Sequence, residues 1–74
     1  SNKKDFPTFG KNVILFSKSS VIGNSKIGNN VTISANAFVI DKKINKNSIV
    51  FGSSPNNSIK RLEKNYIEDY FYDY

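Results

Sequence analysis

Few of the 74 residues carry side chains that catalyse reactions in the usual ways. The chain has no His and no Cys, so it lacks imidazole acid–base groups, thiol nucleophiles and the usual zinc ligands. Eleven Lys and Arg residues outnumber six Asp and Glu residues. The sequence therefore predicts no catalytic residue and no metal site within this chain. The side chains most suited to binding a ligand are the positively charged ones.

This positive charge lies in the first 61 residues. Ten Lys and Arg there stand against Asp5 and Asp41, a net charge of +8, whereas residues 62–74 have one Lys against four carboxylates, a net charge of −3. A basic body can attract a nucleic acid, an anionic membrane or a phosphorylated small ligand. The same lysines can also simply keep a small β protein soluble.

A period of six residues is the strongest pattern in the chain. Written in rows of six from residue 9, the first column is apolar, the fourth column is Asn in four rows of six, and the fifth is small or β-branched until Lys43. The first column consists of Phe9, Leu15, Val21, Ile27, Ile33 and Val39. The fourth contains Asn12, Asn24, Asn30 and Asn36, and the fifth contains Val13, Ser19, Ser25, Val31 and Ala37.

A period of six does not fit one face of an α-helix. Six residues advance a helix by about 600°, so the repeated position drifts around the helix by about 120° in each repeat. The period fits short β segments that each end in a tight turn, and Asn tolerates the left-handed backbone of such turns. Three segments would make one coil of 18 residues, with coils about 4.8 Å apart. An ordinary antiparallel domain would instead show regular alternation and Asn-Gly hairpins, and the chain has no Asn-Gly.

The repeated pattern of an aliphatic residue, Gly, two variable residues and a small residue resembles that of the hexapeptide-repeat acyltransferases. Residues 39–52, with the Asn-Ser-Ile-Val-Phe-Gly strand and the following Pro55, resemble the closing loop, final strand and exit of that family. The likeness covers about residues 5–62 and is closest to the C-terminal part of serine O-acetyltransferases. Phe6 stands where that family has its approach histidine, and the family's catalytic histidine would lie N-terminal to this stretch.

This resemblance implies an all-β fold, a left-handed parallel β-helix, whose handedness rests on the resemblance alone. We expect an approach segment at 1–8, then about two coils with a closing loop and strand at 9–52. An exit turn and a C-terminal α-helix would follow at 53–74. Apolar residues spaced by three or four, with Ser58 as a candidate N-cap, predict that helix. They are Ile59, Leu62, Tyr66, Ile67, Tyr70, Phe71 and Tyr74.

The resemblance also implies acetyl-CoA as co-substrate, with its pantetheine arm running along the outside of the coils. Small residues at the turns would let the ligand approach the main chain closely. Carried over residue by residue, these turns fall at Ser17 and Ala35, with Ser19 and Ala37 beside them. Lys42, together with Lys43 and Lys46, would pair with the nucleotide phosphates.

The expected function is that of the C-terminal part of an acetyl-CoA-dependent O-acetyltransferase of serine acetyltransferase type. It would be a cytoplasmic enzyme acting on a small hydroxyl acceptor, serine or a sugar, and this chain alone would be inactive. We expect a homotrimer with prism axes side by side, or else self-pairing through the exposed edge of the N-terminal coil. The chain contains no Met, which favours a piece of a longer protein. The longest apolar run, 13–16, falls far short of the about 20 residues of a membrane span.

Two other functions remain open. The first is a catalytically silent β-helical module for trimerisation or scaffolding. A histidine in further upstream hexapeptides would favour the enzyme, and a start codon just before Lys3 would favour the scaffold. The second is nucleic-acid binding, which ranks last because the lysines are scattered and only Phe16 and Phe38 are aromatic within residues 10–50.

Overall fold

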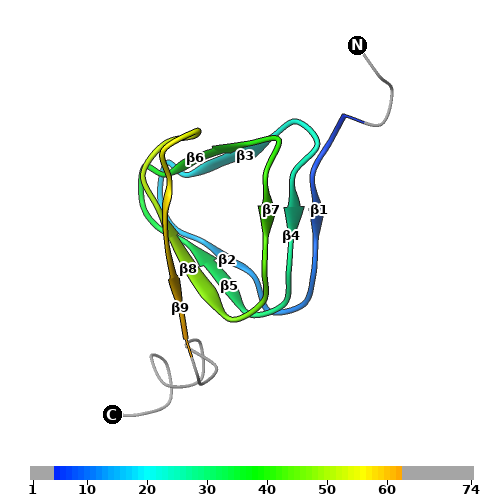
Figure 1. Cartoon of the computed structure of the whole chain (residues 1–74), viewed down its shortest axis with the longest axis vertical. Helices are drawn as coiled ribbons and strands as arrows, with labels where there is room; N and C mark the ends of the chain where they lie inside the picture. The colour runs from blue at the N-terminus through cyan, green and yellow to red at the C-terminus, as the bar shows by residue number, and fades with distance from the viewer. Residues whose placement is uncertain (1–4, 63–74) are drawn as a thin grey trace.

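The computed structural model describes residues 5–62, which form nine short strands and no helix (Figure 1). Each strand has only two to four residues, because a turn follows almost at once. The strands are β1 (Thr8–Phe9), β2 (Ile14–Leu15), β3 (Ser20–Ile22), β4 (Lys26–Ile27), β5 (Val31–Ile33), β6 (Phe38–Ile40), β7 (Lys43–Ile44), β8 (Ser48–Phe51) and β9 (Ser58–Arg61).

The strands build three sheets that the chain visits in turn. Sheet A has the order β1-β4-β7, sheet B the order β2-β5-β8-β9, and sheet C consists of β3 and β6. Every pair is parallel except β8 with β9. Figure 1 shows the three sheets as the sides of a triangle, which we call the prism, with successive coils stacked behind one another. The predicted all-β class is therefore confirmed.

The register confirms the predicted length of a coil and shows one shortening. Asn12 and Asn30, at the same place in successive coils, are 18 residues apart, whereas Asn30 and Asn47 are 17 apart. The lost residue lies at the corner between sheets C and A, where the chain uses residues 23–25 on its first pass and only 41–42 on its second. Because of this deletion, Lys43 aligns with Lys26 and not with the small residue Ser25.

The first column of the repeat supplies the centre of the core. Ile27, Ile33 and Val39 are at most 4% exposed, and Val21 is partly buried against them. Phe9 and Leu15 are 45% and 50% exposed, although they are in register with Ile27 and Ile33. No strand among residues 5–62 pairs with the outer edges of the first coil, so its apolar side chains remain at an end of the stack.

The recurring Asn residues do mark tight turns, with one shift in position. Asn12, Asn30 and Asn36 have φ angles of 58°, 58° and 64°. At the corner between sheets C and A, Gly23 takes the left-handed conformation, with φ 70°, and Asn24 does not. A residue without a Cβ adopts this conformation more easily than Asn, which accounts for the shift.

The predicted helix beginning at Ser58 is wrong at its N-terminus. Residues 58–61 form β9, which lies antiparallel to β8, and the Leu62 backbone N–H donates to the Asn47 carbonyl at 2.7 Å. The free edge of β8 offers backbone hydrogen bonds, whereas a short isolated helix is only marginally stable. The remainder of the predicted helix, 63–74, lies outside the described residues.

Candidate functional site

The two small residues predicted to contact a cofactor lie at the corner between sheets B and C. Ser17 and Ala35 are both exposed, in turns of successive coils. The Asn36 backbone N–H donates to the Ser17 carbonyl at 3.0 Å, which holds the two turns one above the other. The exposed main chain at this corner can thus be approached by an extended ligand.

The two neighbouring residues of this predicted site face the protein itself. The Ser19 hydroxyl donates to the Phe16 carbonyl at 2.7 Å and so stabilises its own turn. Ala37 is only 1% exposed and belongs to the core. Small size is therefore required at both positions by the turn and the packing.

Lys42 lies at a different corner, between sheets C and A. Its backbone N–H donates to the Ser25 hydroxyl at 3.2 Å, and its Nζ donates to the Pro55 carbonyl at 3.1 Å. Strand β6 separates it along the chain from the turn that contains Ala35. The structure therefore groups four of the five predicted residues and places Lys42 apart from them.

A second candidate site, which the sequence did not reveal as a unit, is a groove of about 480 Å³ along sheet A. Its walls are β4, β7 and the residues that follow each strand, with one side chain from β9. Four of its lining residues are cations, and none is acidic or aromatic. The cations are Lys26, Lys43, Lys46 and Arg61.

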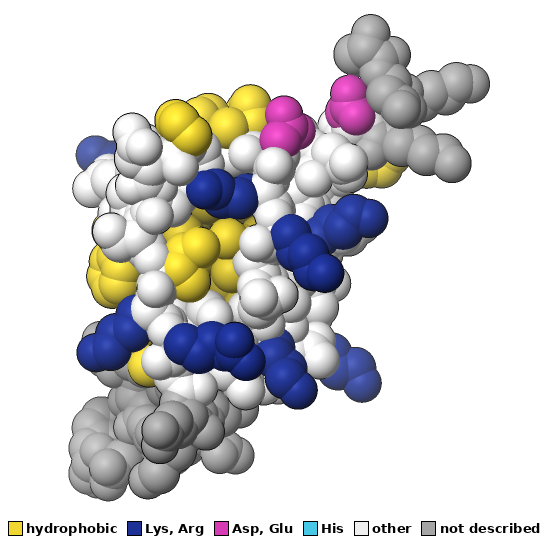
Figure 2. Space-filling view, viewed as in Figure 1, with side chains coloured by type: hydrophobic (Ala, Val, Ile, Leu, Met, Phe, Trp, Pro, Cys, Tyr) yellow, Lys and Arg dark blue, Asp and Glu magenta, His cyan; other side chains and the backbone are white. Residues whose placement is uncertain are grey.

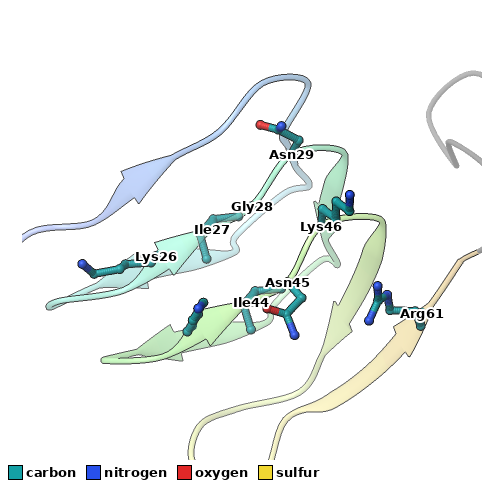
Figure 3. A pocket seen from close by; sticks show the side chains of 9 residues that line it. Lys26, Ile27, Gly28, Asn29, Ile44, Asn45, Lys46 and Arg61 are labelled. Atoms are coloured by element: carbon teal, nitrogen blue, oxygen red, sulfur yellow. The ribbon is translucent and has the colours of Figure 1, made fainter.

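The fold brings these cations together from separate parts of the chain. Lys26 and Lys43 are register partners on the adjacent strands β4 and β7. Arg61 is the register partner of Ser48, at the start of β8. In Figure 3, its side chain extends from β9 toward the end of β7, where Asn45 lies. The 17-residue spacing and the unforeseen strand β9 hid this cluster from the hexapeptide pattern.

Among residues 5–62, no carboxylate lines the groove to balance the charge of these cations. The two acidic residues of the described chain, Asp5 and Asp41, do not line the groove. Figure 2 shows Lys and Arg side chains around a hydrophobic area, with the acidic groups together near the top of the view. Charge separated in this way gives the groove a positive potential that attracts anions.

Gly28, also in the groove, has a structural reason for its identity. A Cβ at this position would lie 2.8 Å from the Lys46 backbone nitrogen and 3.1 Å from the Ile44 carbonyl oxygen. Both distances are too short for ordinary packing, so the next coil can stack only on a glycine here. Gly28 therefore shapes the groove wall without itself indicating a ligand.

The described residues show no other chemical centre. Within residues 5–62 there is no group of three or more Asp or Glu side chains placed to hold a metal ion. The same stretch has no helix with the length and apolar character needed to cross a bilayer. Comparison of the chain with protein-family models, with curated proteins and with solved structures finds no match.

Proposed function

We propose that this chain is the cofactor-side part of a cytoplasmic, acetyl-CoA-dependent O-acetyltransferase of serine acetyltransferase type, with a left-handed parallel β-helix fold. The observation that carries the proposal is the stacking of successive coils, 18 and then 17 residues apart, around three sheets whose strands are parallel except for β9. That geometry, together with the aliphatic-Gly-x-x-small pattern, is what the family resemblance requires. The handedness and the chemistry come from the resemblance.

The corner between sheets B and C is the proposed place for the pantetheine arm of acetyl-CoA. Ser17 and Ala35 are exposed there, one above the other, and neither side chain is large enough to keep an extended ligand from the main chain. A pantetheine arm has two amides, which backbone groups can bind at close range. Ser19 and Ala37 support this surface from behind.

The reacting groups are expected outside this chain. With no His in 74 residues, the acid–base step of the family mechanism needs a residue from another segment or another subunit. The acceptor would be a small hydroxyl compound, serine or a sugar. A homotrimer with prism axes side by side would provide the second wall of the cofactor groove.

Calorimetric titration with acetyl-CoA tests the cofactor assignment. In Ala35→Trp, the indole would cover the exposed turn, and we expect acetyl-CoA affinity to fall at least tenfold. Asn24→Trp is the matched control, because Asn24 is an exposed turn residue at a different corner, and it donates to Asp41 through its backbone N–H and not through its side chain. Unchanged affinity in Ala35→Trp would remove this corner as the cofactor site.

A catalytically silent trimerisation or scaffold module is the second candidate. One observation favours it: Lys18, exposed and left-handed with φ 61°, places a long side chain beside Ser17 in the first turn. That side chain crowds the surface that a cofactor would use. Wild-type protein that shows no heat of binding with acetyl-CoA, while still assembling into trimers, would support the scaffold over the enzyme.

A further inference from the structure

We propose that the groove along sheet A is a binding site for the diphosphate group of a small molecule. Its cations come from three strands or the turns after them, which the fold alone brings together: Lys26 from β4, Lys43 and Lys46 from β7 and its following turn, and Arg61 from β9. Lys43 and Lys46 are also two of the lysines that the family resemblance assigns to the nucleotide phosphates of acetyl-CoA. The groove, however, lies on a different side of the prism from the corner with Ser17 and Ala35, so it is tested separately.

The pairing of Lys26 with Lys43 is the first argument. The two residues are direct register partners on adjacent parallel strands, so two like charges emerge side by side. Like charges directly opposite in a sheet are destabilising, and an anion bound between them would offset this repulsion. Within residues 5–62 no acidic residue lines the groove, and we assign the compensating anion to a ligand.

Arg61 and Asn45 supply directional hydrogen bonding at the other end of the groove. Figure 3 shows Arg61 reaching from β9 toward the end of β7, close to where Asn45 and Lys46 follow the strand. A planar guanidinium donates two parallel N–H bonds to a phosphate, and an amide adds another donor. Lys26 and Lys43 thus provide point charges at one end, whereas Arg61 provides an oriented fork, together with the charge of Lys46, at the other.

The size and lining of the groove select the ligand class. A volume of about 480 Å³ lies within the range of about 300–1,000 Å³ that is typical of small-molecule sites. Cations at both ends suit two linked phosphoryl groups better than one. Nucleic-acid strands are bound by stacking their bases on aromatic side chains, and no aromatic residue among 5–62 lines this groove. A small diphosphate is therefore the occupant that the lining favours.

The groove is also distinct from the proposed cofactor corner. Sheet A forms one side of the triangle in Figure 1, and the corner between sheets B and C lies opposite it. One ligand on one chain therefore does not span both places. If acetyl-CoA does not bind at the corner with Ala35, the diphosphate proposal still stands. If pyrophosphate does not bind in the groove, the proposal for the corner with Ala35 still stands.

Inorganic pyrophosphate is the probe for this site, with titration followed by calorimetry and by backbone amide NMR. We expect the double variant Lys26→Gln/Lys43→Gln, and separately Arg61→Gln, to weaken pyrophosphate binding at least tenfold, since each removes charge-assisted hydrogen bonds. Lys60→Gln is the matched control: it removes the same charge next to Arg61, but Lys60 does not line the groove. That variant should change the affinity less than twofold.

Three outcomes would overturn the proposal. One is an equal loss of affinity in Lys60→Gln and in the groove variants, because binding would then follow net charge alone. Another is amide shifts that do not include residues 43–46. The third is tighter binding of a single-stranded oligonucleotide than of pyrophosphate, with the same variants weakening it, which would assign the groove to nucleic acid. Retained amide spectra in the Gln variants show that each one is folded.

Discussion

At the scale of single residues, Asn30 connects three coils at the corner between sheets A and B. The Asn12 Nδ2 donates to the Asn30 Oδ1 at 3.1 Å, and the Asn30 Nδ2 donates to the Asn47 Oδ1 at 3.1 Å. All three residues have positive φ, so each Asn provides both the turn and one step of an amide ladder. The recurring Asn is thus explained by two requirements, a left-handed turn at each corner and side-chain hydrogen bonds between successive coils.

We predict that Asn30→Ala lowers the free energy of unfolding by about 2–3 kcal/mol. About 1–2 kcal/mol comes from placing a Cβ without a local hydrogen bond in the left-handed region, and about 1 kcal/mol from the lost amide bonds. Asn30→Gly removes the ladder without the backbone cost, so its loss should be smaller by at least about 1 kcal/mol. Urea unfolding measures both, and equal losses in the two variants would contradict the role of the turn.

At the scale of elements, the hexapeptide columns predicted the strands of the first two coils and failed where the spacing changed. Six-residue periodicity identified the buried Ile27, Ile33 and Val39 because side-chain size repeats with the coil. It could not show that the corner at 41–42 is one residue shorter, since a single deletion shifts every later column. Lys43 therefore falls within the predicted closing loop, although it lies on strand β7 beside Lys26.

The candidate sites also divide into residues in regular coils, which the sequence places correctly, and residues after the change of spacing, which it does not. Ser17 and Ala35 were predicted to share an exposed corner, and they do, because both lie within regular coils. Lys42 was not separated from Lys43 and Lys46 in the sequence, because strand alternation and the shortened corner decide which cation faces which surface. Arg61 was hidden by the helical spacing of apolar residues after Ser58. That spacing carried no information about the free edge of β8, with which the segment pairs.

The hydrogen bond at the end of strand β9 leads to a prediction about the stability of that strand. The Leu62 N–H donates to the Asn47 carbonyl at 2.7 Å, which fastens the end of β9 to the corner before β8. We expect Leu62→Pro, which removes this donor, to speed amide exchange across β9 and to cost about 1 kcal/mol in stability. Leu62→Ala keeps the N–H and controls for loss of the side chain. Exchange that is equally fast in both variants would show that side-chain packing, not this hydrogen bond, holds the strand.

At the scale of the whole molecule, exposed apolar side chains lie at one end of the stack and on sheet C, as well as on β8 and β9 of sheet B and at Phe6. Phe9 and Leu15 are 45% and 50% exposed in the first coil, whereas Ile22 and Ile40 are 42% and 37% exposed as register partners on β3 and β6. The isoleucine pair forms an apolar strip along the outside of the prism. Side-by-side packing of three prisms would cover that strip, whereas pairing end to end would cover Phe9 and Leu15.

The trimer proposal therefore predicts which substitution changes the mass in solution. Light scattering of the wild-type protein at micromolar concentration should give three times the chain mass of 8.3 kDa. Ile40→Lys places a charge in the strip on sheet C, so we expect it to shift the protein toward monomer. Leu15→Lys puts the same charge at the end of the stack and should leave the trimer intact. A wild-type protein that is monomeric would contradict assembly altogether, and dissociation by Leu15→Lys alone would assign the contact to the first coil, because only end-to-end pairing buries that edge.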